Sequence, residues 1–243
     1  MKGKLYVIGT GPGSDDLISG RALKAIEESS VIAGYGVYTD LIAHKIEGKE
    51  IITTPMKQEV ARCEKALEVA KSGKIVSLIS SGDAGVYGMA GLIYEIAGND
   101  DIDIEVIPGI SAVLAAAAKL GAPLTHDFAV ISLSDLLTPW EKIEKRLKNA
   151  AEAEFVIAIY NPSSKKRADY LRKACEIMKP YISDDIICGY VRNCERDEEE
   201  IGTLTFKELF DFQADMFTLI IIGNSTTKLI NKKMVTPRGY KGI

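Results

Sequence analysis

The segment KLYVIGTGPGSDDLIS, residues 4–19, decides the fold. Its first six residues are mostly apolar and β-prone, so they predict a buried strand. Three alternating glycines follow at once in residues 9–13. Glycine allows the backbone to approach another group closely. Because ligands in open α/β sheets bind beyond the carboxyl ends of the strands, this loop is a candidate binding site.

The same pattern of strand, loop and helix continues through the first half of the chain. In residues 59–72, Val60, Cys63, Leu67 and Ala70 recur at spacings of three and four, which predicts one buried helical face. Nearly unbroken apolar strands joined by helices indicate a sheet covered on both faces, which is the α/β class. The predicted strands are residues 4–9, 30–34, 74–80 and 103–109.

The alternation resumes after residues 121–127. We therefore predict two consecutive α/β domains, residues 1–121 and 122–243. The tail from Lys228 to Ile243 has five basic and no acidic residues, and one interpretation is a solvated or frayed terminus. The predicted strands of this half are residues 128–133, 154–160, 185–191 and 216–223, and the predicted helices are residues 139–149 and 164–179.

The composition is that of a globular protein, with 47% hydrophobic and 26% charged residues in a chain of 243. No apolar run reaches the roughly 18 residues of a membrane helix, and the start of the sequence does not resemble a signal peptide. We expect a cytoplasmic protein without a membrane partner.

The net charge of −4 gives no basic excess for nucleic acid. Four cysteines without a CxxC pair and two histidines predict reduced thiols and no protein-bound metal.

The first glycine loop departs from the dinucleotide-binding fingerprint. That fingerprint is GxGxxG with an acidic residue about 20 positions later, on the ribose hydroxyls. Here Pro12 lacks the N–H that a phosphate cradle would use, and the following strand region, SSVIAGYG, contains no acid. Both departures count against NAD. Asp15 and Asp16 are explained as cap and dipole partners of the next helix.

Two further glycine-rich loops follow predicted strands. In SSGDAGVYG, residues 80–88, Asp83 can accept hydrogen bonds from an ammonium group or from hydroxyls. A tight turn before a helix at residues 86–98 is the structural alternative. In PGISAVLAAAAKLGAP, residues 108–123, Ser111 can cap a helix of small side chains. Such a helix fits a nearby ligand or ordinary close packing.

Taken in this order, GTGPGSDDLIS, SSGDAGVYG and PGISAVLAAAAKLGAP resemble the tetrapyrrole methylase superfamily. HDFAVISLSDLLTPWEKIEKRL, IYNPSSKKR, GYVRNCERDEEE and VTPRGY are similar to the branch that methylates C17 of precorrin-3B or cobalt-factor III with ring contraction. The resemblance covers essentially the whole chain. It implies S-adenosylmethionine as cofactor, bound between two α/β domains. It also implies a corrin-precursor substrate in cobalamin biosynthesis, and a homodimer.

The resemblance also implies cofactor contacts on both halves of the chain. Cys194 stands where the family commonly has glycine, and at this position the sequence departs from the family pattern. The implied contact residues are Pro12, Gly82, Asp83, Val86, Ser111, Ala112, Asn161 and Cys194.

In such a reaction the macrocycle carbon attacks the methyl group directly, so the protein mainly positions the reactants. Ring contraction needs proton transfers, for which the loop residues His126, Asp127 and Glu195 are candidates, with a cap or surface role as the alternative. A polycarboxylate substrate also needs cations in an acidic chain. The candidates, each of which could instead be a solvated side chain, are Lys165, Lys166, Arg167, Arg192 and Arg196.

Three alternatives stay open. Methylases that act on another corrin carbon, on diphthamide or on ribosomal RNA share the first three motifs, although the second half of the chain argues against them. A nicotinamide oxidoreductase would also be an α/β protein with early glycines. A binding module without catalytic activity would bind cofactor or tetrapyrrole without turnover.

Overall fold

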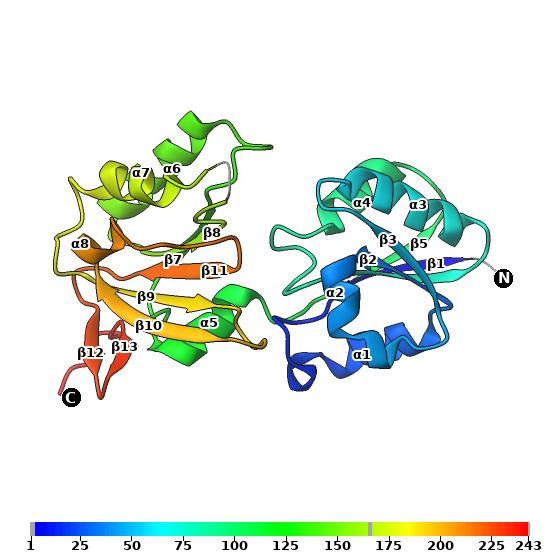
Figure 1. Ribbon diagram of the computed structural model, residues 1–243, viewed down its shortest axis with the longest axis horizontal. Coiled ribbons are helices and arrows are strands. Elements are labelled where there is room, and N and C mark those ends of the chain that lie inside the picture. Colours follow the sequence, from blue (N-terminus) through cyan, green and yellow to red (C-terminus); the bar gives the residue numbers. More distant parts are fainter. Residues whose placement is uncertain (1–2, 165–166, 243) are drawn as a thin grey trace. The chain divides into compact units, whose positions relative to one another are not determined.

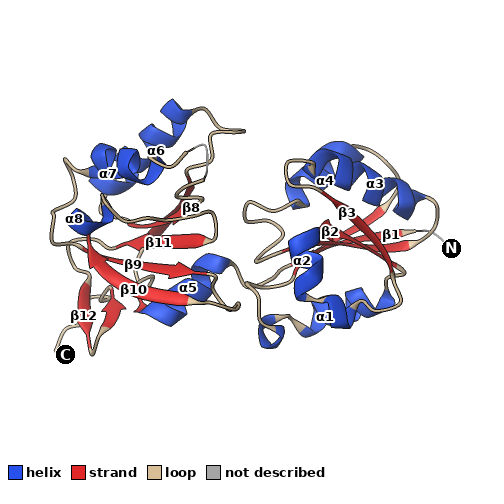
Figure 2. Cartoon of the chain, in the orientation of Figure 1, coloured by secondary structure: helices blue, strands red, loops and turns tan. Residues whose placement is uncertain are grey.

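The computed structural model describes residues 3–164 and 167–242 of the chain. The chain separates into two units, Met1–Ala112 and Val113–Ile243, each with its own five-stranded sheet (Figure 1). Helices and strands alternate through the first unit and through much of the second, which confirms the α/β class (Figure 2). Among the described residues, no helix has the length and apolar character needed to cross a membrane.

The first unit is built on a sheet in which all neighbouring strands are parallel. Their carboxyl ends, at Gly9, Tyr35, Thr54, Ser80 and Ile107, therefore lie along one edge, which we call the first carboxyl edge. In spatial order the strands are β3 (Glu50–Thr54), β2 (Val31–Tyr35), β4 (Ile75–Ser80), β1 (Lys4–Gly9) and β5 (Asp103–Ile107).

Helices cover both faces of this sheet because alternate strand residues point to opposite sides. On one face, α1 (Gly20–Glu28) packs its buried Ala22, Ala25 and Ile26 against Ile8 and Ile79. The short helix α2 (Gly36–Leu41) follows β2. The opposite face is covered by α3 (Glu59–Lys71) and α4 (Ala90–Ala97).

Two details of the predicted helices are wrong. Val60 is predicted on the buried face of α3, but its side chain is 52% exposed. The buried stripe of this helix is centred on Cys63, Ala66 and Ala70, and Val60 lies at the margin of that stripe in the first turn. Helix α4 begins at Ala90 and not at residue 86. The preceding residues form a turn, which the N–H of Ala90 closes by donating to the carbonyl of Ala84 at 3.0 Å.

The second unit has a mixed sheet. Its strands β7, β8 and β9 run in one direction, and β10 and β11 run in the opposite direction. The carboxyl ends of the first three, at Ser132, Tyr160 and Arg192, define the second carboxyl edge. In spatial order the strands are β10 (Glu200–Thr205), β9 (Ile187–Arg192), β11 (Thr218–Ile222), β8 (Val156–Tyr160) and β7 (Phe128–Ser132).

Helices also cover this second sheet. One face packs against α6 (Trp140–Glu152), α7 (Tyr170–Met178) and α8 (Phe206–Leu209). The other face packs against α5 (Ala112–Leu120), whose small side chains allow a close approach. Helix α7 begins at Tyr170, later than the predicted start at residue 164.

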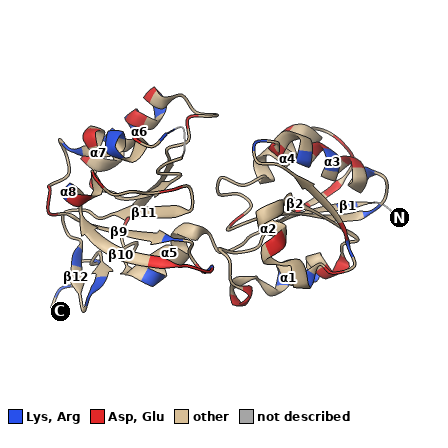
Figure 3. Cartoon of the chain, viewed as in Figure 1, with Lys and Arg blue, Asp and Glu red and all other residues tan. Residues whose placement is uncertain are grey.

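The basic tail is folded, so the interpretation of residues 228–236 as a solvated or frayed terminus is wrong. Strands β12 (Lys228–Ile230) and β13 (Lys233–Val235) form a hairpin, and β13 pairs with β6 (Gly121–Ala122). Met234 and Thr236 are fully buried. The basic residues of the hairpin, Lys228, Lys232 and Lys233, are exposed. Figure 3 shows the basic positions at β12 in blue.

Candidate functional site

The three glycine-rich loops of the first unit meet at the first carboxyl edge. Gly11 and Gly82 exchange two backbone hydrogen bonds, of 3.1 and 2.7 Å. A Cβ on Gly109 would lie 2.2 Å from the carbonyl oxygen of Gly82, and a Cβ on Gly9 would lie 2.6 Å from the nitrogen of Gly109. Only glycine fits at positions 9 and 109, so the loops after β1, β4 and β5 form one continuous backbone surface.

Asp83 braces two of these loops. One carboxylate oxygen accepts a hydrogen bond from the N–H of Gly85 at 2.8 Å, within its own loop. The other accepts from the N–H of Gly109 at 3.0 Å, in the loop after β5. Asp83 therefore fixes the relative position of the second and third loops.

The structure brings six of the predicted cofactor contacts to this edge: Pro12, Gly82, Asp83, Val86, Ser111 and Ala112. Gly82 has a φ of +70°, and a Cβ there would lie 3.5 Å from the nitrogen of Ala112, so the second and third loops touch at this point. Val86 is 37% exposed, whereas Ser111 is buried.

The charge of these loops limits what they can bind. In residues 9–13, 80–88 and 108–112 the only charged side chain is Asp83. The loops carry no lysine or arginine for a phosphate group. They therefore suit a ligand with sulfonium and ammonium cations better than a dinucleotide.

Asp15 has a different partner from the one predicted. It lies in a short 3₁₀ helix, Asp15–Leu17, and its carboxylate pairs with Lys45 at 2.9 Å and with His44 at 2.6 Å. The hydrogen bond from Lys45 lowers the pKa of Asp15. Asp15 therefore ties this loop to a neighbouring turn. Neither aspartate caps α1, whose N-cap is Ser19, but Asp15 and Asp16 both lie in the first turn of the 3₁₀ helix, as dipole partners do.

The second carboxyl edge holds the two remaining predicted cofactor contacts. Asn161 directly follows β8 with a φ of +51°, and its amide donates to Ser132 Oγ at 3.0 Å. Cys194 follows β9 and is 8% exposed. Burial raises the pKa of its thiol to about 12, so this thiol is protonated at neutral pH.

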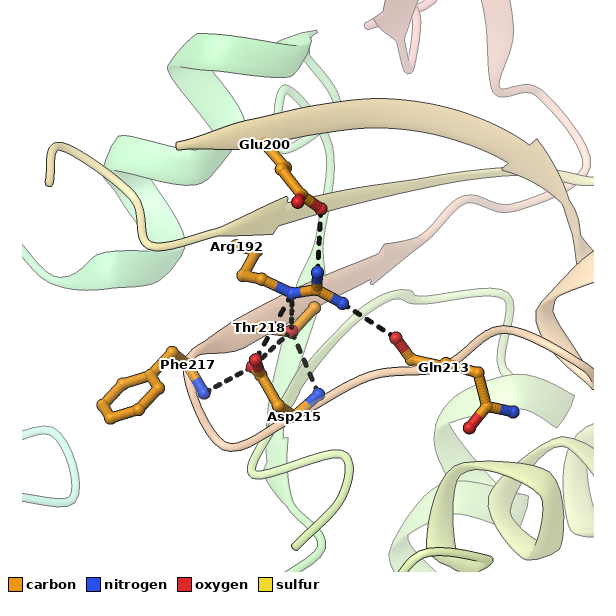
Figure 4. Close-up of polar contacts among 6 residues, drawn as sticks. All are labelled: Arg192, Glu200, Gln213, Asp215, Phe217 and Thr218. Atoms are coloured by element: carbon orange, nitrogen blue, oxygen red, sulfur yellow. Dashed lines mark hydrogen bonds and ion pairs between the residues drawn. The ribbon is translucent and has the colours of Figure 1, made fainter. Parts of the chain in front are cut away.

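Arg192 is held by several groups of its own unit (Figure 4). Its guanidinium pairs with Glu200 at 2.9 Å and with Asp215 at 3.3 Å. It also donates to the carbonyl of Gln213 at 2.9 Å and to Thr218 Oγ1 at 3.4 Å. Arg192 therefore links the end of β9 to the starts of β10 and β11.

Of the basic cluster after β8, Lys165 and Lys166 lie outside the described residues. Arg167 pairs with Asp135 at 2.6 Å, and Tyr170 donates to the same carboxylate at 2.7 Å. The hydrogen bond from Tyr170, followed by the charge of Arg167, lowers the pKa of Asp135. Arg167 thus fastens the segment after β7 at the second carboxyl edge.

Glu195 and Arg196 occupy the loop between β9 and β10. Lys119 of α5 pairs with Glu195 at 2.7 Å and with Glu199 at 3.2 Å. The hydrogen bond to Glu195 raises the pKa of Lys119. The guanidinium carbon of Arg196 lies 6.0 Å from the centre of the Phe217 ring.

The structure does not bring His126 and Asp127 to the same edge as the other candidates. They precede β7, and the carbonyl of Asp127 accepts a hydrogen bond from Val156 at the start of β8. They therefore lie at the opposite edge of the sheet from Asn161 and Glu195. Across the residues that the structure describes, no group of three or more His, Cys, Asp or Glu side chains could hold a metal ion.

Comparison with known proteins gives the family of this chain. A family model described as tetrapyrrole (corrin/porphyrin) methylases matches residues 4–209. A "cobalt-factor III methyltransferase" of Priestia megaterium is 47% identical over 99% of this chain and 46% of its own length. The chain thus spans about half of that relative. A "probable cobalt-factor III C(17)-methyltransferase" of Salmonella typhimurium LT2 is 46% identical over 97% of this chain and 99% of that protein.

A solved structure of "the methyltransferase CobJ" superposes with a TM-score of 0.90 at 37% identity, covering 97% of this chain and all of that one. The matched family model extends over both units described above. This chain therefore belongs to the tetrapyrrole methylase family.

Proposed function

We propose that this chain is an S-adenosylmethionine-dependent methyltransferase of cobalamin biosynthesis, which methylates C17 of cobalt-factor III or precorrin-3B with ring contraction. Family membership and the names of its relatives support the proposal. The observation that carries it is the backbone surface of the three glycine loops, with Asp83 as its only charged side chain. These features fit a cationic cofactor and give no support to a nicotinamide dinucleotide.

The cofactor would supply an electrophilic methyl group to the nucleophilic carbon of the macrocycle. The role of the chain is then to hold the two reactants in line and to exclude water, which can contribute roughly 7–11 kcal/mol. Asp83 keeps two of the loops in register through Gly85 and Gly109. No nucleophilic side chain is required, and Cys194, with its raised pKa, is unsuited to that role.

The carboxylates of a corrin precursor would meet cations on the second unit. We propose Lys165, Lys166 and Arg196 as direct contacts. Arg167 and Arg192 already pair with Asp135 and Asp215, so their first role is to shape the second carboxyl edge. Either arginine can contact substrate only in addition to these partners, or by exchanging one of them.

For the proton transfers of ring contraction, the geometry favours Glu195 over His126 and Asp127. Glu195 lies at the second carboxyl edge, beside Cys194, whereas the other two lie at the opposite edge. Its ion pair with Lys119 holds the carboxylate in place at this edge.

A ligand-binding measurement separates this proposal from the oxidoreductase alternative. Adenosylhomocysteine should raise the melting temperature of the protein, whereas NADH should leave it unchanged, because only a ligand of the folded state stabilises it. Stabilisation by NADH alone would contradict the proposal. The homodimer implied by the resemblance stays a prediction, and light scattering would test it.

A further inference from the structure

One buried cation in the first unit has no place in the chemistry above. Arg62, on α3, is 3% exposed. Within residues 3–164 and 167–242 its Nε makes no hydrogen bond, and the contacts of its guanidinium go to carbonyl oxygens, a sulfur and an aromatic ring, with no carboxylate among them. A buried charge without a counter-ion is costly, so its contacts require an explanation.

The guanidinium of Arg62 contacts residues at or beyond the carboxyl ends of three neighbouring strands. Its Nη2 donates to the carbonyl oxygens of Thr54 at 3.1 Å and Pro55 at 3.2 Å, at the end of β3. Its Nη1 lies 3.5 Å from the sulfur of Met89, just after the second glycine loop. Its central carbon lies 5.9 Å from the centre of the Tyr35 ring, at the end of β2. All three strand ends belong to the first carboxyl edge.

These contacts give the second glycine loop an anchor on each side. Asp83 fastens the start of the loop to Gly109, and Arg62 contacts Met89 just beyond its end. The buried neighbours of Arg62 on α3 are apolar, and an apolar side chain would fill its position at a lower desolvation cost. Its two hydrogen bonds join α3 to the end of β3, and its contact with Met89 extends this link to the second glycine loop.

We propose that Arg62 is a positioning residue for the cofactor loop of residues 80–88. It sets the conformation in which that loop binds adenosylmethionine, and it does not touch the cofactor itself. This inference rests on the proposed function.

The test compares the full-length variants Arg62→Met and Arg62→Lys with wild type. The control is Lys74→Met, which removes a cation paired with Glu50 at 2.5 Å near the amino end of β4. Each protein is assayed for melting temperature without ligand, for the Kd of adenosylhomocysteine by calorimetry, and for hydrogen exchange of residues 80–89.

Arg62→Met should fold with a melting temperature near that of wild type. Its Kd should rise by about tenfold or more, because a small displacement of a positioning loop is costly. Exchange should speed up in residues 80–89, and also beside Thr54 and Pro55, whose carbonyls lose their donor. Arg62→Lys should have an intermediate Kd, since an ammonium group can donate to the carbonyls but cannot span all the contacts. Lys74→Met should bind as wild type does.

A wild-type Kd in Arg62→Met would overturn the inference. If that variant does not fold, Arg62→Lys decides, and a wild-type Kd there would show that the guanidinium is not needed. Failure of the wild-type protein itself to bind adenosylhomocysteine would refute the proposed function. In that case hydrogen exchange of residues 80–89 still tests the role of Arg62. If these residues exchange in the Arg62 variants as slowly as in wild type, Arg62 does not position the loop.

Discussion

The carboxylate of Asp83 accepts a hydrogen bond from the backbone N–H of Gly109 at 3.0 Å, although the two residues are 26 positions apart in the chain. This contact joins the loop after β4 to the loop after β5. With the hydrogen bonds between Gly11 and Gly82, it makes three separate loops behave as one binding surface. The cofactor affinity should therefore depend on groups that hold the loops together.

Replacing Asp83 by Asn should weaken this surface. Asn has a single acceptor oxygen, so the N–H of Gly85 or of Gly109 would face an amide donor. The free energy of unfolding should fall by about 1–2 kcal/mol, and the Kd for adenosylhomocysteine should rise by about tenfold. Urea denaturation and calorimetry measure the two effects. The exposed Asp16→Asn is the matched control, and equal Kd values for the two variants would remove Asp83 from the site.

Substitutions at Gly82 and Gly109 should separate binding from folding. A β-branched residue at Gly82 has an unfavourable φ of +70°, and its Cβ meets only van der Waals contacts, the nearest being 3.5 Å away. Gly82→Val should abolish cofactor binding while unfolding stays cooperative. Gly109→Ala should lower the stability itself, because its Cβ would lie 2.2 Å from the carbonyl of Gly82. Calorimetry measures the cofactor affinity of the two variants, and thermal denaturation measures their stability. Unchanged affinity in Gly82→Val would exclude the second loop from the site.

Cys194 should make the stability of the second unit sensitive to alkaline pH. Burial raises the pKa of its thiol from an ordinary 9.0 to about 12. Below pH 9 the thiol is protonated in both states. Between pH 9 and 12 only the unfolded chain loses the proton, so this group lowers the free energy of unfolding as the pH rises, by up to about 1.4 kcal/mol per pH unit.

Urea denaturation of wild type and Cys194→Ala at pH 8.5 and 10.5 isolates this effect, because all other titrating groups are shared. The loss of stability between the two pH values should be smaller in the variant. Equal losses would mean that Cys194 titrates alike in the folded and unfolded chain.

The basic residues after β8 should divide into two roles. Lys165→Ala with Lys166→Ala should raise the KM for the tetrapyrrole and flatten its salt dependence, while the cofactor Kd stays constant. Arg167→Ala should also destabilise the fold, by up to about 1 kcal/mol, because Asp135 loses its cationic partner and keeps only the hydrogen bond from Tyr170. Steady-state kinetics at two salt concentrations and urea denaturation separate the roles. A double lysine variant with the KM and salt response of wild type would mean that both side chains are merely solvated.

Much of this fold could be predicted from apolar runs and glycine loops. Two edge strands, β3 and β10, could not, for physical reasons. Strand β3 lies at an edge of the sheet, and three of its five residues are exposed. Strand β10, EIGTLT, is likewise an edge strand with mostly polar or small residues. Neither gives the buried apolar run by which the central strands were found.

The candidate site shows the same limit. Its glycines follow strands in the sequence, so their common edge could be expected from the topology of a parallel sheet. The partners of Arg192 could not, because Asp215 and Gln213 lie more than 20 residues away along the chain. The sequence indicated cations at a substrate edge. It contained no signal that two of the arginines are already paired with carboxylates.

The central claim is methyl transfer from adenosylmethionine to the corrin precursor. The most direct measurement incubates the purified protein with adenosylmethionine carrying an isotope-labelled methyl group and with either cobalt-factor III or precorrin-3B, and follows the products by mass spectrometry. We predict one labelled methyl group in the tetrapyrrole, adenosylhomocysteine in equal amount, and attachment at C17 by NMR. Two results would contradict the account. One is a labelled product that is methylated at another carbon. The other is the absence of methyl transfer to either substrate by protein that does bind adenosylhomocysteine.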